Sequence, residues 1–132
     1  MKYLCLICAE KVMEQMPEAD ADAHFREYGE FTEAIRKSGH FVGCNRLLPP
    51  AAATTIRVRN GKVSATDGPW VETKEQLGGY YLIEARDLNE AIRIAAKIPG
   101  ASRGCVEIRP VAEDAQTIAV LGLGAPGLAT HP

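Results

Sequence analysis

The stretch TDGPWVETKEQLGGYYLIEA, residues 66–85, joins a charged turn to an apolar strand. Asp67, Gly68 and Pro69 predict a tight turn, because Asp accepts backbone hydrogen bonds, Gly allows unusual backbone angles and Pro fixes its own φ. Polar residues follow at 72–76, and the Gly pair at 78–79 leaves room for another backbone or a ligand. Two interpretations stay open: a surface connection, or the wall of a pocket.

A β-hairpin is predicted directly before this turn. Residues 54–66 form it around Asn60-Gly61, a pair typical of two-residue hairpin turns. Such a turn pairs Val58 with Val63, so that apolar side chains share one face. The hairpin therefore carries Asp67 to the turn in a fixed position.

Four apolar runs predict the core strands, of which the first and third are apolar on both faces. They are residues 2–9, 40–48, 80–85 and 105–111. With right-handed crossovers, this order gives an α+β fold, a ferredoxin-like βαββαβ sandwich with an inserted hairpin. Two helices can cover one face of the sheet. Because the other face is apolar as well, we expect two copies to pack face to face as a homodimer.

Two helices are predicted from caps and apolar periodicity. The first is capped by Asp20 or Asp22, and Gly39 is its expected C-cap. Its inner face comprises Ala21, Phe25, Tyr28, Phe31, Thr32 and Ile35. The second opens on a capping box at 87–90. Its expected buried stripe comprises Leu88, Ala91, Ile92, Ala95 and Ile98.

Composition limits the number of domains and the class of function. The 132 residues leave room for one domain, at 1–111, followed by a tail at 112–132 that we expect to be mobile or loosely packed. A net charge of −2 gives no basic surface, so no nucleic-acid partner is expected. The apolar runs are too short for a membrane span or a signal peptide, so we expect a cytoplasmic protein without membrane contact.

Cysteine and glycine patterns indicate neither a metal nor a cofactor. Cys5 and Cys8 have C-x-x-C spacing, but strand residues three apart face opposite sides of the sheet, so we expect no metal site there. Residues 122–127 match G-x-G-x-x-G. That fingerprint requires a strand before it and a helix after it, so no dinucleotide cofactor is predicted.

The motif DGPWVETKE at 67–75, followed by QLGGYYLI at 76–83, resembles the signature of the YCII-related family, in the branch named after its DGPF motif. The resemblance covers residues 1–111, and Trp70 stands where the family usually has Phe. It implies a dimeric α+β barrel of ferredoxin-like topology. Some relatives are fused to, or encoded beside, extracytoplasmic-function sigma factors. A few members of the wider family are dehydrochlorinases of aromatic ring compounds.

Candidate site residues follow from the motif and from the first helix. In the wider family a His near the start of this helix pairs with an Asp after the second helix; His24 matches the His, and the Asp is missing. Asp67 and His24 are the candidate catalytic groups, because each can move a proton. The candidate ligand-binding residues are Gly68, Pro69, Trp70, Thr73, Lys74, Tyr80, Tyr28 and Arg109. Among them, the cations Lys74 and Arg109 would hold an anionic ligand.

Two classes of function stay open. The favoured one is a binding module with a pocket near the DGPW–ETKE loop, which takes a small-molecule ligand or a sigma-factor-related protein partner. The alternative is a cofactor-independent small enzyme, lyase- or dehydrochlorinase-like, that acts on a small organic or aromatic compound. The missing Asp favours the binding module.

Overall fold

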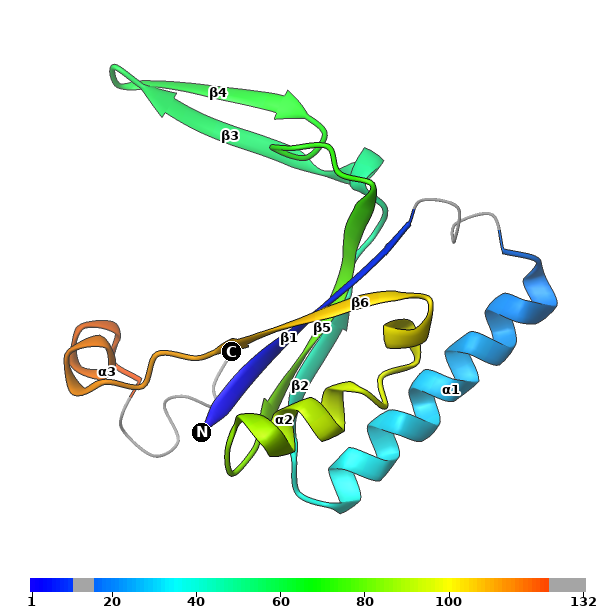
Figure 1. The fold of residues 1–132 in the computed structure, drawn as a ribbon. Coiled ribbons are helices and arrows are strands. Elements are labelled where there is room, and N and C mark those ends of the chain that lie inside the picture. The colour runs from blue at the N-terminus through cyan, green and yellow to red at the C-terminus, as the bar shows by residue number, and fades with distance from the viewer. Residues whose placement is uncertain (11–15, 124–132) are drawn as a thin grey trace.

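The computed structural model describes residues 1–10 and 16–123, so most of the G-x-G-x-x-G stretch at 122–127 lies outside the described residues. The fold is α+β with antiparallel strands (Figure 1). The strands are β1 (Lys2–Glu10), β2 (Phe41–Arg46), β3 (Thr54–Arg59), β4 (Lys62–Asp67), β5 (Glu75–Glu84) and β6 (Gly104–Pro110). The helices are α1 (Glu18–Lys37), α2 (Leu88–Ala95) and α3 (Ala115–Leu121).

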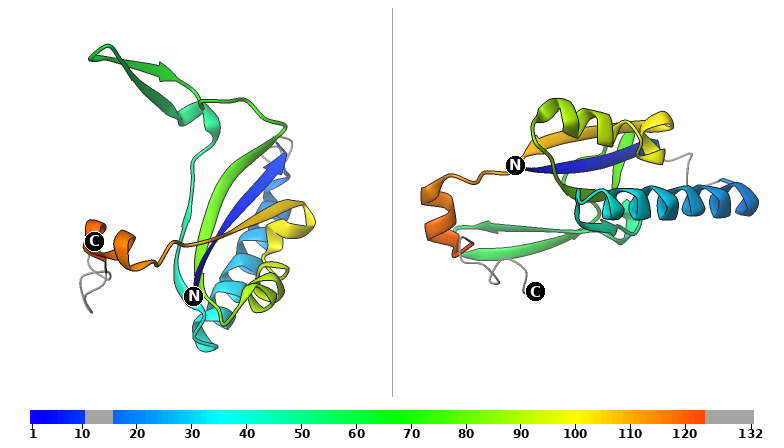
Figure 2. Two further views of the ribbon diagram at one scale, coloured as in Figure 1. Left: turned by 60° about the vertical axis from the view of Figure 1, so that its left-hand side comes forward. Right: turned by 90° about the horizontal axis from the view of Figure 1, so that it is seen from below.

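The main sheet has the strand order β2-β5-β1-β6, and each strand is antiparallel to its neighbours. The two central strands, β1 and β5, are those whose sequences are apolar on both faces, as predicted. α1 and α2 cover one face of the sheet and leave the other face open (Figures 1 and 2). This arrangement is compatible with the expected ferredoxin-like topology, with β3 and β4 inserted as a separate two-stranded sheet.

The hydrophobic core lies between the main sheet and the two helices that cover it. Cys5 from β1 and Ile83 from β5 are fully buried there. α1 contributes two buried residues from its C-terminal half, Phe31 and Ile35. The complete buried cluster comprises Tyr3, Cys5, Phe31, Ile35, Tyr81, Ile83, Ala85, Ala91, Ile94, Ala95 and Ile98.

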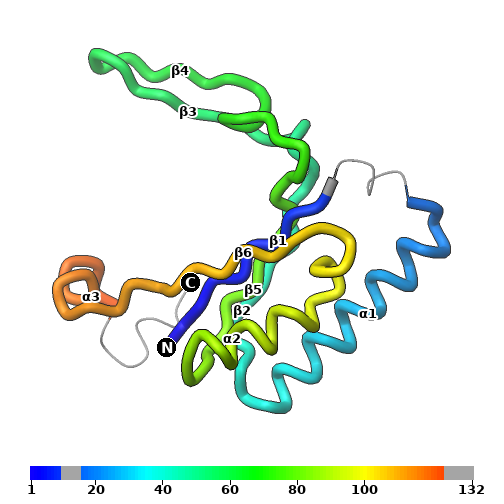
Figure 3. Tube along the Cα trace, in the orientation of Figure 1, coloured from blue at the N-terminus to red at the C-terminus, as the bar shows by residue number. Residues whose placement is uncertain are grey.

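β3 and β4 form an arm that extends away from the main sheet (Figure 3). Val58 pairs with Val63 across the turn, which confirms the predicted register. Asn60 and Gly61 have φ values of 52° and 75°, as this kind of tight turn requires. Both strands are exposed along almost their whole length.

The start of α1 differs from the prediction. The helix begins at Glu18 with Pro17 as its N-cap, so neither Asp20 nor Asp22 caps it. Pro is suited to a helix start because its fixed φ and missing N–H cost nothing there. The acidic side chains in the first turn, Glu18 and Asp20, interact favourably with the positive end of the helix dipole. At the other end, Gly39 follows the C-cap residue instead of occupying it, with a φ of 81°.

β5 is longer than predicted and begins at Glu75. Its first residues still pair with β1, across a bulge between Ile7 and Cys8. Gly79 lies inside the strand, where an added Cβ would lie 2.8 Å from the carbonyl oxygen of Asn45. Both glycines therefore lie inside β5 and not at its start. The missing side chain of Gly79 lets β5 approach β2 closely.

The Asp87 half of the predicted capping box of α2 is confirmed, because the Asp87 side chain accepts a hydrogen bond from the Glu90 N–H at 2.9 Å. The Glu90 side chain accepts from the Arg86 N–H at 2.9 Å instead of from the N–H of Asp87. The predicted buried stripe is partly wrong. Leu88 and Ile92 are 49% and 48% exposed, whereas Ile94 is buried. The predicted stripe and the buried one, which comprises Ala91, Ile94, Ala95 and Ile98, both have helical spacing. Packing against the sheet selects the stripe that contains Ile94.

α3 lies in the segment for which no element was predicted. The Asp114 side chain caps it by accepting a hydrogen bond from the Thr117 N–H at 2.9 Å, and Gly122 ends it with a φ of 68°. The helix follows β6 and lies on the side of the sheet opposite α1 and α2 (Figure 2). Across the described residues, no helix is long and apolar enough to cross a membrane.

A candidate ligand-binding cleft

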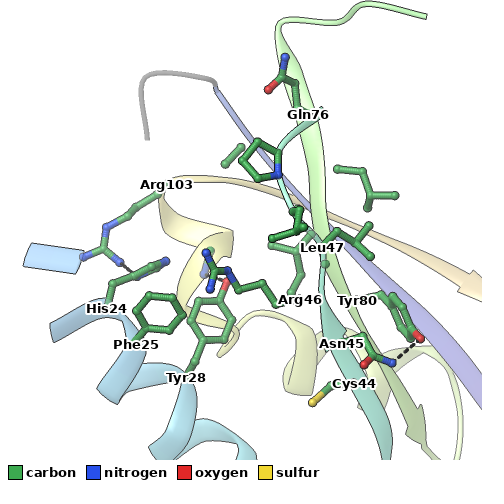
Figure 4. A pocket seen from close by; sticks show the side chains of 18 of the residues that line it. His24, Phe25, Tyr28, Cys44, Asn45, Arg46, Leu47, Gln76, Tyr80 and Arg103 are labelled. Carbon is green, nitrogen blue, oxygen red and sulfur yellow. Dashed lines mark hydrogen bonds between the residues drawn. The ribbon is translucent and has the colours of Figure 1, made fainter. Parts of the chain in front are cut away.

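A cleft of about 480 Å³ lies beside the N-terminal half of α1. The C-terminal half of this helix is anchored in the core by Phe31 and Ile35, whereas Phe25, nearer its start, is half exposed. Residues of α1, β1, β2 and β5 line the space, together with Gly100 of the short 3-10 turn Pro99–Ser102 and with Arg103, which follows that turn (Figure 4). The cleft therefore opens where α1 is no longer packed tightly against the sheet.

His24 and Arg103 meet on the α1 side of the cleft (Figure 4). Nη1 of Arg103 lies 2.6 Å from Nδ1 of His24 and 3.6 Å from Oε2 of Glu27. A guanidinium has only donors, so Nδ1 accepts, and the neutral ring carries its proton on Nε2. Burial, followed by the positive charge of Arg103, lowers the pKa of His24 from its usual 6.5, while Glu27 opposes this shift. Near pH 7, His24 is therefore a neutral hydrogen-bond donor.

Two tyrosine rings form an aromatic part of the lining. The rings of Tyr28 and Tyr81 are nearly parallel with centroids 6.4 Å apart, and His24 meets Tyr28 edge-on at 4.9 Å. The Tyr28 hydroxyl accepts a hydrogen bond from the Gly100 N–H at 3.0 Å, and the Tyr81 hydroxyl lies 2.6 Å from Oγ1 of Thr32. Burial raises the pKa of both phenols, so both stay neutral.

The opposite wall comes from β2 and the residues after it (Figure 4). The guanidinium carbon of Arg46 lies 4.8 Å from the centre of the Phe25 ring, in a cation–π contact. Asn45, whose side chain points to the other face of the sheet, donates to the Tyr80 hydroxyl at 2.8 Å. The cleft thus continues round the β2 edge. Its described lining residues include two guanidinium groups and one imidazole, but no carboxylate.

The site residues predicted from the sequence fall into separate regions. His24, Tyr28 and Tyr80 line the cleft. Arg109 lies on β6, where its Nε donates to the carboxylate of Glu107. The remaining predicted residues lie at the base of the arm and are not part of the cleft lining: Asp67, Gly68, Pro69, Trp70, Thr73 and Lys74.

The turn that begins at Asp67 is fixed to the base of the arm. Gly68 has a φ of 98°, a conformation that glycine adopts readily. Its N–H donates to the carbonyl oxygen of Ala53 at 2.7 Å, and its own carbonyl oxygen accepts from Oγ1 of Thr55 at 2.7 Å. Trp70 is 76% exposed, so this rigid turn presents a large aromatic side chain to solvent.

Sequence reasoning did not place Arg46, Arg103 or Phe25 in a site. Arg103 contacts His24 across 79 positions of the chain, and nothing in its local sequence distinguishes it from a surface cation. Phe25 was assigned to the inner face of its helix, and no local signal indicates its contact with Arg46. Within the part of the chain that the structure describes, no three His, Cys, Asp or Glu side chains form a group that could hold a metal ion.

The fold and the cleft define a small α+β protein whose four-stranded antiparallel sheet carries two helices on one face. The chain belongs to the YCII-related family, whose domain model matches residues 1–114. It is also similar to an uncharacterised protein of Rhizobium meliloti (strain 1021), with 46% identity over 69 residues. That match covers 51% of this chain and 56% of the relative, so it spans about half the length of each protein.

Proposed function

We propose that this chain is a binding module that holds a small organic anion with an aromatic or apolar body in the cleft. The lining carries the proposal: Arg46, Arg103 and His24 lie there without a carboxylate among the described lining residues. Guanidinium groups bind carboxylates through paired hydrogen bonds, and the neighbouring aromatic rings offer surface to a ligand ring. The cleft volume of about 480 Å³ is within the usual range for small-molecule sites.

The alternative function, a cofactor-independent enzyme, requires a group that takes up a proton. His24 is poorly suited to that role, because Nδ1 accepts from Arg103 and the other ring nitrogen carries the proton. Its Nε2–H is suited to donating a hydrogen bond to an anion instead. A long-range proton–nitrogen NMR spectrum of the imidazole rings distinguishes the two functions, since the Nδ1–H tautomer would favour the enzyme.

The turn at 67–70 favours a second candidate function, the binding of a protein partner. Trp70 is 76% exposed, and tryptophan is enriched among the residues that contribute most to protein interfaces. The D-G-P-W sequence also supports placing the chain in the DGPF branch of the family. A sigma-factor-related partner stays a prediction that rests on the resemblance alone.

A homodimer is part of the proposal. The face of the main sheet that α1 and α2 leave open carries the half-buried side chains of Leu4, Leu6 and Leu82, which lie opposite the helix-facing positions of their strands. A second copy would cover this apolar surface. Sedimentation equilibrium of the full chain tests the dimer directly.

Ligand binding is tested by isothermal titration calorimetry with benzoate and chlorobenzoates, and with neutral benzamide as the matched probe. The variants are Arg46→Gln and Arg103→Gln, with Arg57→Gln as the control because it removes an exposed cation from the arm. We expect the carboxylates to bind and benzamide to bind much more weakly. Each cleft variant should lose about 1.5–3 kcal/mol of binding free energy, whereas Arg57→Gln should lose none.

Asp67→Ala separates the cleft from a pocket at the turn. Binding in the cleft predicts that this variant keeps the wild-type affinity. A ligand that is lost in Asp67→Ala and retained in Arg103→Gln would place the site at the turn instead. Equal affinities for benzoate and benzamide would contradict the assignment of an anionic ligand.

A further inference from the structure

The arm formed by β3 and β4 carries an apolar face that its own chain leaves uncovered. Ile56, Val58 and Val63 are each more than half exposed, Val63 to 70%. An isolated two-stranded hairpin is at best marginally stable in water, and uncovered apolar surface of this kind marks an interaction site. The arm is therefore shaped to be covered by another surface.

α3 presents a second uncovered apolar surface. Val120 and Leu121 are 76% and 63% exposed. The segment before the helix is held against β1, because the Lys2 N–H donates to Oε1 of Glu113 at 2.8 Å. The apolar side chains of α3 are thus held at a fixed place in the molecule but remain exposed.

The arm and the segment that contains α3 carry opposite net charges. Residues 54–67, which form the arm, contain three basic residues and one acidic residue, Asp67 at the end of β4. Residues 112–123 contain two acidic residues, Glu113 and Asp114 just before α3, and no basic one. Complementary charge steers two surfaces together and fixes their register, while apolar contact supplies affinity. The arm and the segment 112–123 therefore complement each other in net charge and in exposed apolar surface.

The two surfaces lie at opposite ends of the main sheet, on the same side of it. The arm leads into β5, whose start lies beside the end of β1, where Gln76 pairs with Ala9. β6 leads to α3, and its end lies beside the start of β1, where Pro110 pairs with Tyr3. Both the arm and α3 project from the face that α1 and α2 leave open (Figure 2). Consider two copies whose open sheet faces lie against each other, related by a two-fold axis that runs between the sheets and perpendicular to the strands. This axis reverses the strand direction, so the arm of one copy lies at the end where the other copy carries α3.

We propose that the arm of each copy binds α3 of the second copy, so that two equivalent contacts clasp the dimer. The proposal rests on the homodimer proposed above and names the elements that stabilise it. A second copy is the occupant because each chain supplies both halves of the contact, a basic arm with an apolar face and an apolar α3 that follows two acidic residues. Two-fold symmetry then forms both contacts at once.

Sedimentation equilibrium of full-chain variants tests the clasp. Val63→Lys and Val120→Glu should each raise the dimer dissociation constant by about tenfold or more. Combined in one chain, they face each other across the interface with opposite charges and should recover much of the loss. The matched control, Val63→Lys with Val120→Lys, should remain at least as weak as either single variant. Circular dichroism spectra that match wild type show that each variant is folded.

The outcomes separate the clasp from the dimer itself. A wild-type chain that stays monomeric overturns both proposals. A wild-type dimer whose dissociation constant does not respond to the single variants overturns the clasp and leaves the dimer of facing sheets. Weakening without recovery in the opposite-charge pair also overturns the arm-to-α3 contact.

Chemical crosslinking of the unmodified protein gives a second measurement that requires no variant. A carbodiimide joins a lysine to a carboxylate that it contacts, and Lys62 and Glu113 are the expected pair. In a mixture of unlabelled and isotope-labelled chains that have exchanged subunits, crosslinked pairs that join an unlabelled peptide to a labelled one should appear beside the unmixed pairs. A Lys62 crosslink to Glu113 confined to single chains, or a crosslinked dimer without this pair, would overturn the clasp.

Discussion

Nδ1 of His24 accepts a hydrogen bond from Nη1 of Arg103 at 2.6 Å, which joins α1 to the turn that precedes β6. The positive charge of Arg103 is one cause of the lowered pKa of His24, after burial. Arg103→Gln should therefore raise this pKa, but leave it below 6.5 because the burial remains. An NMR titration of the imidazole signals measures the change, with Arg57→Gln as the control. A pKa that falls in Arg103→Gln would contradict the assigned contact.

The same shift predicts how stability depends on pH. The folded-state pKa of His24 is lowered, so the unfolded chain binds the proton more tightly than the folded chain. The free energy of unfolding should therefore fall as the pH drops through 6.5 toward the folded-state pKa, and change no further from this residue below it. Urea unfolding of wild type and His24→Gln over this range measures the effect. Parallel pH profiles for the two proteins would show that His24 does not contribute.

Gly79 and Gly78 are neighbours with different surroundings, which makes them a matched pair. A Cβ at Gly79 would lie 2.8 Å from the backbone oxygen of Asn45, whereas a Cβ at Gly78 meets nothing within 4 Å. Gly79→Ala should therefore cost about 1–3 kcal/mol of folding free energy, as overpacking does. Gly78→Ala should be close to neutral. Equal losses in urea unfolding would mean that β2 and β5 are not packed so closely.

Thr32 and Tyr81 share a part-buried hydrogen bond of 2.6 Å between their hydroxyl oxygens. Thr32→Val removes the partner of the Tyr81 hydroxyl and should cost about 1–3 kcal/mol, the usual penalty for an unsatisfied buried polar group. Thr32→Val combined with Tyr81→Phe removes both partners, so its loss should be smaller than the sum of the single losses. Denaturant unfolding of the three variants completes the cycle, and strict additivity would argue against the bond.

The features predicted correctly from the sequence are those that local rules determine. The turn at Asn60-Gly61 fixes the register of β3 and β4 because only residues that tolerate positive φ suit it. The apolar sequences of β1 and β5 place both strands in the centre of the sheet, since a central strand is covered on both faces. Neither conclusion requires knowledge of a distant residue.

The cleft could be predicted only in part, because its polar groups come from distant segments. The position of His24 on the first helix was predicted, but Arg103 reaches it from 79 residues away, and no periodicity encodes that contact. Arg46 is the last residue of the short strand β2 and has the pattern of an exposed cation. The contact between the Arg46 guanidinium and the Phe25 ring depends on how α1 crosses β2. Tertiary packing, and not local sequence, brings these groups together.

α2 shows how two equally regular patterns compete, and it gives a direct test. Ile92 and Ile94 lie on the same helix, but Ile92 is 48% exposed and Ile94 is 8% exposed. Substitution by Ala changes the helix propensity of both positions in the same way. Ile94→Ala should therefore cost about 2–5 kcal/mol through the cavity it leaves, and Ile92→Ala much less. Urea unfolding measures both, and a larger loss for Ile92→Ala would mean that α2 turns the other stripe toward the sheet.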